Sequence, residues 1–585
     1  MTDPNELTHR IVETKAGAKL SRSMMDSFIG NRHEFNHCEK ISRNLYKVRK
    51  GVYTIAGLSI ANCTFIEGQS GLIVFDTGNN IGQGQEILKK IREVSDKPIR
   101  AIIYSHHHYT GGTRLFVEEN KAQACAIYGH PKIEYNRQNT FSAFGRMQMR
   151  RGGIQVGQYL PEKGEDAAVG MTEPRYEDPG MNKNGHLPAT HAVADREEVL
   201  IDGLNAQFFQ IVADTDDSLA VWFPELDMIL HNAAVMRVFH PFYTLRGDFY
   251  RSPEGAIRGI DIMRNIKPEY LVGCHGAPFI GREKAYKAMT RVRDSYAFVY
   301  QQSVRAINQG RTPDQMVKEI QLPDHLKNDP LLYEGYIRIQ YAVRGFYRGM
   351  VGWFAEDTAD LNPPLPEVLA REIVDGFGGP EKVIQRCRIL FEQHQYELAA
   401  KLVTYVLQVD PENEQARQLK ADALRIMAQL SPDIQSRHFY LTHALSLEKK
   451  IDTSKPPAVK FFGDQGIDDI LNTKPGAMIK LLENMLDPQK SRDVEKSLHI
   501  AFTDLNQGFG LVVRKGVAEF TAHADADADL GLELTRTVWL SVYFRLTTLK
   551  KALESGEAKM TAGSVPELED FLSLFDRFKY IKKVR

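Results

Sequence analysis

The sequence predicts a chain of three parts: a layered α/β domain, an all-helical domain, and a smaller α/β domain. Short apolar runs alternate with helical stretches from about residue 45 to 285. Helical periodicity replaces this pattern after about residue 294, and a second mixed pattern fills the last 130 or so residues. We therefore place the domains at residues 1–285, 286–450 and 451–585.

Composition narrows the classes of protein. The 585 residues are 43% hydrophobic and 25% charged, as in folded soluble proteins. Because the net charge is only −1, no basic field is available for nucleic acid or an anionic membrane. No apolar run is long enough to span a membrane, and the first residues carry no signal-peptide pattern. Five scattered cysteines argue against disulfides, so we expect a cytoplasmic protein.

The first domain begins with a predicted hairpin. Asn62–Glu67 and Leu72–Gly78 are its strands, joined by a glycine-flanked turn. A helical pattern at Gln85–Val94 and a buried strand at Ile99–Tyr104 complete a βαβ unit. Residues 130–200 are rich in Gly, Pro, Asn and charge, and we expect long substrate-side loops there. The next predicted strand is Glu198–Ile201.

The second and third domains are predicted from changes in the periodicity of apolar residues along the sequence. Phe391–Ala400 and Ala416–Leu424 predict a helix–turn–helix pair that resembles one tetratricopeptide-type hairpin. One such hairpin cannot bury its own apolar face, so further helices or a second subunit must cover it. In the third domain, Phe509–Val513 and Val517–Phe520 predict a hairpin. The acidic run His523–Asp529 fits a solvated edge strand better than a cation site.

The chemistry is expected where the strand ends at Tyr104. Three consecutive histidines, His106 to His108, follow that strand directly. In extended chain His106 and His108 point the same way, so both can reach one metal ion. A polar surface loop is the alternative.

This arrangement resembles the metallo-β-lactamase superfamily. The strand, the Asp76–Gly78 turn, the helix, the next strand and the Ser-His-x-His motif occur in the same order. Further motifs resemble its alkylsulfatase branch: Tyr243–Gly247, Val343–Tyr347, Gly352–Phe354, Asn362–Pro366, Gly378–Gly379 and Phe439–Thr442. The resemblance implies an αββα catalytic domain, a helical dimerisation domain and a sterol-carrier-like C-terminal domain, hence a homodimer.

The chain departs from the family pattern at the second metal site. The family loop reads His-x-His-x-Asp-His before a Gly-Gly pair, whereas Thr110 and Gly111 stand at the Asp and His positions here. Equivalently, an Asp-His pair is missing after Tyr109. Ala233 stands where the bridging carboxylate is expected, and His275 matches the last histidine. The second site would thus keep His275 alone, which holds a divalent ion poorly.

The same resemblance implies that the first metal site keeps all three of its protein ligands. Asp214 stands at the third-ligand position, so His106, His108 and Asp214 would hold one divalent metal with open positions. Zinc is the first choice, and iron or manganese are the alternatives. The alternative for Asp214 is that it caps a turn, and His107 and His275 are alternative candidates for one ligand position.

Two further residues are predicted to contact an anionic head group such as sulfate. Arg246 can donate paired hydrogen bonds from its planar fork, with Tyr243 beside it. A structural salt bridge is an equal alternative for Arg246. His240 and Arg237 lie nearby in sequence, and Asp76 fits a supporting role better than a catalytic one.

Three functions fit these observations. The first is a metal-dependent hydrolase of an alkyl sulfate or related ester, whose substrate carries an anionic head and an alkyl chain. The second is a mononuclear metalloenzyme of divergent oxidative or elimination chemistry. The third is a catalytically silent dimeric binding protein.

Overall fold

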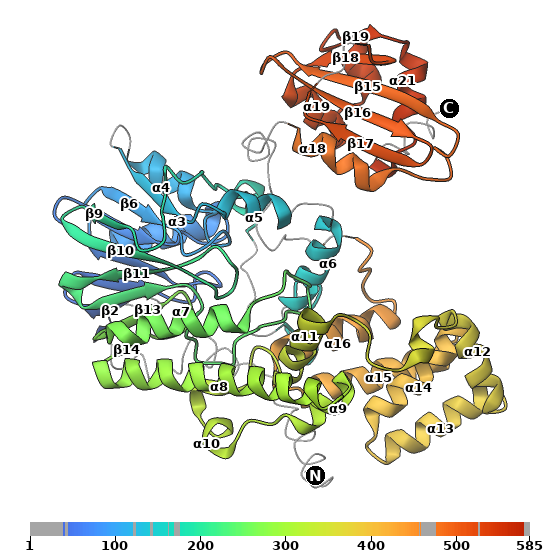
Figure 1. Ribbon diagram of the computed structural model, residues 1–585, viewed down its shortest axis with the longest axis horizontal. Coiled ribbons are helices and arrows are strands. Elements are labelled where there is room, and N and C mark those ends of the chain that lie inside the picture. Colours follow the sequence, from blue (N-terminus) through green and yellow to red (C-terminus); the bar gives the residue numbers. More distant parts are fainter. Residues whose placement is uncertain are drawn as a thin grey trace. The chain divides into compact units, whose positions relative to one another are not determined.

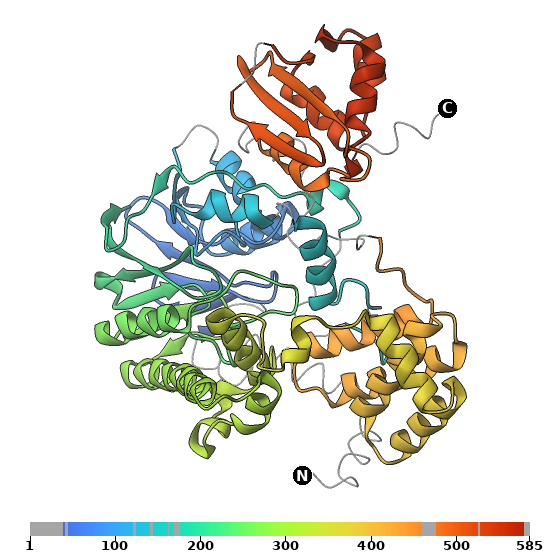
Figure 2. The same ribbon diagram turned by 45° about the vertical axis from the view of Figure 1, so that its right-hand side comes forward.

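The computed structural model describes residues 39–40, 45–120, 124–140, 144–161, 163–168, 176–455, 457, 476–523 and 527–577. It divides into two compact units, residues 1–137 with 146–464 and residues 138–145 with 465–585, which are described separately (Figures 1 and 2).

Two sheets form the catalytic part of the first unit. The eight-stranded sheet keeps its strands in chain order, and β5 to β8 run parallel. Its strands are β1 Glu39–Lys40, β2 Leu45–Arg49, β3 Val52–Ile55, β4 Cys63–Glu67, β5 Leu72–Phe75, β6 Ile99–Ile103, β7 Ala126–Gly129 and β8 His191–Ala192. The predicted β4–β5 hairpin and the predicted β6 strand are therefore confirmed.

The second sheet has six strands in the order β14-β13-β12-β11-β10-β9. All its neighbours are antiparallel except β12 and β13. Its strands are β9 Glu198–Ile201, β10 Leu204–Ile211, β11 Ser218–Phe223, β12 Met228–His231, β13 Tyr270–Gly273 and β14 Phe279–Ile280.

The two sheets pack face to face and helices cover their outer faces. Phe75 and Ile103 of the first sheet share one buried core with Phe208 and Val221 of the second. On the outside of the first sheet lie α3 (Ile81–Arg92) and α4 (Thr113–Glu119); α7 (Pro253–Ile266) and α8 (Arg282–Asn308) cover the second (Figure 1). This is the predicted αββα fold.

Three local predictions need correction. Helix α3 begins at Ile81 rather than Gln85, because the Asn80 side chain caps it by accepting a hydrogen bond from Gln83 N. The region expected to be only loops contains α5 (Ile133–Thr140) and α6 (Gly145–Gln155), whose many polar residues hide the helical period. The predicted boundary between residues 285 and 286 falls within α8.

A helical region follows within the same unit. Its helices are α9 Pro313–Glu319, α10 Asp324–Lys327, α11 Ile339–Val351, α12 Pro366–Gly376, α13 Pro380–Glu392, α14 Tyr396–Val409, α15 Glu414–Leu430 and α16 Ile434–Leu447. The predicted helix pair is α14 and α15. Their apolar sides pack with α12 and α13 around Val383, Cys387 and Val403, so neighbouring helices cover the face that one hairpin leaves open.

The second unit is a small α/β domain with a sheet in the order β17-β16-β15-β18-β19. Its elements are α18 Ala477–Lys480, β15 Glu495–Phe502, β16 Gln507–Arg514, β17 Val517–Thr521, β18 Leu530–Leu534, α19 Arg536–Tyr543, α20 Leu549–Glu554, β19 Ala558–Ala562 and α21 Val565–Leu572. The β16–β17 hairpin is confirmed, with Lys515 and Gly516 in its tight turn at positive φ. Part of the acidic run, residues 524–526, lies outside the described residues. The sterol-carrier likeness stays a prediction. Among the described helices, none is both long and apolar enough to cross a membrane.

Candidate metal centre

The residues expected to carry the chemistry lie at neighbouring strand ends of the two sheets. The histidine run directly follows β6, Asp214 lies between β10 and β11, and His275 follows β13. A backbone hydrogen bond of 2.8 Å from Leu219 N to Ser105 O joins the start of β11 to the end of β6. The layered fold thus brings together residues more than 100 positions apart.

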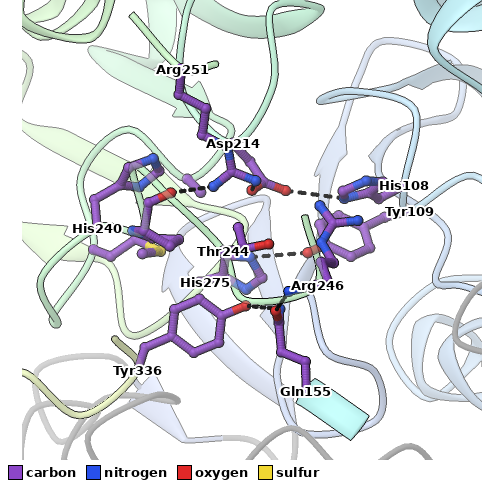
Figure 3. Close-up of a pocket in the computed structure, with 13 residues that line it drawn as sticks. His108, Tyr109, Gln155, Asp214, His240, Thr244, Arg246, Arg251, His275 and Tyr336 are labelled. Atoms are coloured by element: carbon purple, nitrogen blue, oxygen red, sulfur yellow. Dashed lines mark hydrogen bonds and ion pairs between the residues drawn. The ribbon is translucent and has the colours of Figure 1, made fainter. Parts of the chain in front are cut away.

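His106, His108 and Asp214 form one compact cluster. One potential ligand atom from each lies within 4.8 Å of the other two. Asp214 Oδ2 is 3.3 Å from His106 Nε2 and 3.0 Å from His108 Nδ1. Figure 3 shows Asp214 between His108 and Arg251. Two imidazoles and a carboxylate at this spacing are a ligand set suited to a divalent metal.

A contact at Nδ1 orients the His106 ring so that its Nε2 is left for a metal ion. Its Nδ1 lies 3.0 Å from Ser105 Oγ, while its buried Nε2 has no hydrogen-bond partner among the described residues. Asp76 supports this turn, since its Oδ1 accepts a hydrogen bond of 2.8 Å from Ser105 N. Burial raises the pKa of Asp76 to about 8. An imidazole nitrogen left unbonded beside a carboxylate is an arrangement that a bound cation would complete.

The protonation states of the cluster are those that a metal requires. Burial lowers the pKa of His106, and of His108 more strongly, so both rings are neutral. Burial alone would raise the pKa of Asp214, but Arg251 and the two imidazoles outweigh it and hold that pKa well below its ordinary value. Neutral imidazoles and an ionised carboxylate need lose no proton before a cation binds.

The neighbouring carboxylates and His107 point elsewhere. Asp217 lies 3.0 Å from His107 Nδ1 and accepts a hydrogen bond from the His107 backbone N–H. Asp216 accepts hydrogen bonds of 2.8 Å from Lys132 and Asn136. Asp214 is therefore the one carboxylate of this turn that faces the two outer histidines. This placement favours the ligand interpretation of Asp214 over a turn cap and removes His107 as a substitute.

His275, predicted as a metal ligand, stands apart from the cluster. Its Nε2 lies 3.1 Å from the Tyr109 hydroxyl, and its Nδ1 lies 3.1 Å from the Ile60 carbonyl oxygen. Because the carbonyl only accepts, Nδ1 carries the proton and Nε2 accepts from the phenol. His275 still lines the cavity, as does the methyl group of Ala233. Its side chain is therefore engaged in hydrogen bonds on both ring nitrogens.

The turn after Tyr109 leaves no space for a side chain at either of two glycines. A Cβ atom on Gly111 would lie 2.0 Å from Asn79 O, and one on Gly112 would lie 2.3 Å from Thr77 O. A histidine at Gly111 would therefore collide with the backbone. Thr110 Oγ1 is engaged by Arg137 and His186 at 3.0 and 2.9 Å. Thr110 and Gly111 therefore do not provide the Asp and His expected at these positions from the family pattern.

Two buried guanidinium groups line the other wall of the cavity. Arg246 and Arg251 are 6% and 4% exposed, and both bond Asp248 Oδ2, at 2.5 and 3.1 Å. Arg251 also lies 2.8 Å from Asp214 Oδ1 and donates to the Pro241 carbonyl. Burial opposes the charged form of Arg246, but Asp248 and Asp214 outweigh it and raise its pKa. The cavity therefore presents fixed positive charge beside the metal ligands.

Comparison with known families matches the three regions in order. Residues 56–193 match the metallo-beta-lactamase superfamily, residues 312–450 the family described as alkyl sulfatase dimerisation, and residues 465–581 the alkyl sulfatase C-terminal family. A linear primary-alkylsulfatase of Pseudomonas sp. is 30% identical over 528 residues, which cover 87% of this chain and 98% of that protein. The chain belongs to the alkylsulfatase family.

Other relatives agree with this assignment. The alkyl/aryl-sulfatase BDS1 of Saccharomyces cerevisiae is 26% identical over 551 residues, covering 91% of this chain and 82% of that protein. The solved structure of the stereoselective inverting sec-alkylsulfatase Pisa1 from Pseudomonas sp. shares the fold. Its TM-score is 0.81 at 23% identity, over 91% of this chain and 84% of that one. The predicted family, fold class and metallo-hydrolase type of enzyme are thereby confirmed, with a divalent metal as cofactor.

One predicted contact residue of this alkylsulfatase-family chain is misplaced. Tyr243 is not among the residues that line the cavity; its ring lies against Gly345 of α11, and 36% of the residue is exposed. The next residue, Thr244, lines the cavity instead. Arg237 packs over the Phe279 ring at 4.0 Å and is not among the residues that line the cavity.

Several lining residues were missed or undervalued from the sequence. They are Tyr109, Gln155, His240, Thr244, Arg251 and Tyr336. Arg251 has no signal that links it to Asp214, 37 positions away. His240 Nε2 lies 3.2 Å from the Ala213 carbonyl, and its Nδ1 has no hydrogen-bond partner among the described residues. Burial, and then Arg251, lower the pKa of His240 to about 3, so the ring is neutral.

Proposed function

We propose that this protein hydrolyses alkyl sulfate esters with one divalent metal per chain, held by His106, His108 and Asp214. The observation that carries the proposal is the joint occurrence, in one cavity, of that ligand set and two buried guanidinium groups. The relatives named above are alkylsulfatases, which supports the same substrate class.

A single metal is favoured by what surrounds His275. Within the described residues, no second cluster of His, Cys, Asp or Glu has the spacing of a metal site. Ala233 offers only a methyl group, and both ring nitrogens of His275 have hydrogen-bond partners. Zinc suits a two-histidine, one-carboxylate set with open positions, and iron or manganese suit it as alternatives.

Charge in the cavity favours an anionic substrate. The two guanidinium groups are matched by the carboxylates of Asp214 and Asp248, while the histidines are neutral. A bound divalent cation therefore gives the site a surplus of positive charge for a sulfate monoester. Arg246 bonds Asp248 through one terminal nitrogen, so further donors of its fork remain for sulfate oxygens.

Each polar residue of the cavity is assigned one role in ester hydrolysis. Bound metal supplies Lewis acidity at the scissile ester. Arg246 orients the sulfate and stabilises the charge that grows on it as the alcohol and hydrogen sulfate separate. Arg251 keeps Asp214 ionised through their 2.8 Å contact. His240 presents an unprotonated Nδ1, which can accept a hydrogen bond from the attacking water.

The partner is proposed to be a second copy of the same chain. The matched dimerisation region carries large apolar side chains that are at least 42% exposed: Val351, Trp353, Leu361, Leu365, Val368, Leu369 and Phe377. Single exposed apolar residues are normal on a protein surface, but this many in one region are typical of a surface that binds another protein. We also propose a cytoplasmic location, since Cys63, Cys125, Cys274 and Cys387 are free thiols among the described residues.

Sulfate release and metal content, measured on the same preparation, test the proposal. The wild-type chain should release sulfate from dodecyl sulfate and hold about one divalent ion per chain by elemental mass spectrometry. His108→Ala should lose both. His191→Ala is the control, because that imidazole is on the surface and pairs with Glu197. Metal bound without sulfate release from any ester would refute the substrate assignment.

A further inference from the structure

The segment from His240 to Arg251 has two faces with different chemistry. Five of its residues line the cavity: His240, Pro241, Thr244, Arg246 and Arg251. Three others carry exposed aromatic rings: Tyr243 at 36%, Phe249 at 66% and Tyr250 at 49%. We call these three residues the aromatic strip. It is continuous along the chain with the wall that carries the guanidinium groups.

Helix α11 holds two rings of the aromatic strip in place. A Cβ atom at Gly345 would lie 2.8 Å from Tyr243 Cβ, and one at Gly349 would lie 2.2 Å from the Tyr250 ring. The two glycines are four residues apart, so they share one face of the helix. Each tyrosine therefore packs closely against bare backbone on its inner side while its outer side stays in solvent.

The rest of the segment fixes the strip relative to the anion donors. Gly247 N donates to Thr244 O at 3.0 Å, which closes a turn. Asp248 then bonds both Arg246 and Arg251 and accepts from Phe249 N at 2.9 Å. Phe249 and Tyr250 thus sit directly between the residues that tie the loop to the cavity wall. Figure 3 shows the two guanidinium groups that this loop positions.

The cavity itself has little room for an apolar chain. Its aliphatic lining consists of Ala233, Met236 and Pro241, and the other lining residues carry polar or aromatic groups. An alkyl chain attached to a sulfate held at Arg246 must therefore leave the cavity. Exposed aromatic rings on the same segment offer such a chain apolar surface that water otherwise covers.

We propose that the aromatic strip is a subsite for the apolar chain of an anionic amphiphile, and that it sets the preference for chain length. The inference rests on the proposed function, because the head group is taken to be the sulfate of the substrate. Each methylene that leaves water adds to binding, so affinity and kcat/KM rise with chain length until the chain passes the strip.

The test uses the double variant Phe249→Ser/Tyr250→Ser and a series of hexyl, octyl, decyl and dodecyl sulfates below their micelle concentrations. Wild-type kcat/KM should rise along the series. In the double variant the dodecyl value should fall about tenfold, while the hexyl value stays within about twofold. Phe249→Leu should keep most of the rise. Tyr286→Ser is the control, since that 40% exposed ring lies on α8, outside the strip.

Binding of alkyl sulfonates of the same lengths separates this inference from the proposed function, because their C–S bond is not hydrolysed. If no ester is cleaved, the proposed function fails, yet sulfonate affinity that rises with length in wild type but not in the double variant still supports the subsite. An unchanged slope in the double variant, or an equal loss at every length, overturns it. Dissociation of the double variant into monomers would instead assign the strip to a contact between copies.

Discussion

The cavity has two sides that differ in what surrounds their histidines. On one side His106 and His108 share the carboxylate of Asp214, and one buried imidazole nitrogen has no hydrogen-bond partner among the described residues. On the other side His275 is bonded to a phenol and a carbonyl, and its neighbour Ala233 has no donor atom. His106, His108 and His275 are all buried, so burial alone does not distinguish the two sides.

The difference shows that an imidazole becomes a metal ligand through its neighbours. The ligand side has an anion within 3.3 Å of both rings, and Arg251 keeps that anion ionised. On the His275 side, Nε2 is bonded to the Tyr109 hydroxyl and the neighbouring Ala233 offers only a methyl group. In this protein the His275 side of the cavity is therefore a hydrogen-bonded wall rather than a ligand set.

The largest effect is expected from Asp214→Ala. Removing the carboxylate that the two imidazoles share should abolish metal retention and lower kcat/KM by more than the roughly 10–100-fold seen for outer supporting groups. Elemental mass spectrometry and sulfate release measure the two losses. Asp216→Ala is the matched control, because its carboxylate bonds Lys132 and Asn136 instead. If Asp214→Ala keeps its metal, the two sides of the cavity have been assigned the wrong way round.

A smaller, pH-dependent effect is expected from Arg251→Met. Burial raises the pKa of Asp214 and Arg251 is the largest influence that lowers it, so the variant's carboxylate gains a proton at higher pH. Because a proton competes with the metal, the variant should hold metal roughly 10–100-fold more weakly as the pH falls from 7.5 to 5.5. The wild type, whose Asp214 pKa is well below 3.8, should not.

Metal content after dialysis at the two pH values measures this effect. Arg246→Met is the control: its guanidinium bonds Asp248 rather than Asp214, so metal should stay while kcat/KM for the sulfate ester falls. Equal metal loss in both variants would show that Arg251 acts only through the general positive charge of the cavity.

The same contrast explains which parts of the site the sequence predicts. The apolar β6 strand followed by a His-x-His run is a local pattern, and from it the sequence predicts that His106 and His108 reach one metal ion. In the structure the run lies in a bent segment beyond the strand, which ends at Ile103. The family resemblance, rather than the local pattern, led us to predict Asp214 as the third ligand and an incomplete second metal site. Arg251 and Tyr109 could not be predicted, because their roles are contacts with Asp214 and His275, which are distant in sequence.

Errors in the fold prediction have an equally physical origin. The α/β layers were predicted because apolar periodicity is strong wherever a strand or helix faces a core. Helix α5, Ile-Glu-Tyr-Asn-Arg-Gln-Asn-Thr, has too few apolar residues to show a helical period, so it was expected to be a loop. Tyr243 was expected beside the head group, but it lies in a bend and packs against Gly345 of α11, while Thr244 lines the cavity.

Buried neutral histidines should make the metal-free protein less stable in mild acid. Burial lowers the pKa of His275 to about 4, below its unfolded value near 6.5. Between those values the unfolded chain binds a proton that the folded chain does not, so the unfolding free energy falls as pH drops below 6.5. The fall is about 1 kcal/mol per pH unit for such a group.

Chemical denaturation of chelated protein at pH 7.5, 6.5 and 5.5 measures this slope. His275→Gln should make this slope shallower by the contribution of one buried histidine. A slope that His275→Gln does not alter would mean that the His275 side of the cavity is more open to water than its burial indicates.

The smallest effect is expected from Tyr109→Phe, and it tests the His275 side directly. The variant removes one buried hydrogen bond of 3.1 Å to His275 Nε2, so the unfolding free energy should fall by about 0.5–1.5 kcal/mol. Metal content should stay at one ion per chain, because neither Ala233 nor Thr110 gains a free donor. Tyr300→Phe, which removes an exposed hydroxyl bonded to Glu254, is the control for loss of a phenol. Should Tyr109→Phe bind a second ion, the phenol rather than the missing ligands keeps metal away from His275, and the two sides would differ by one hydroxyl group.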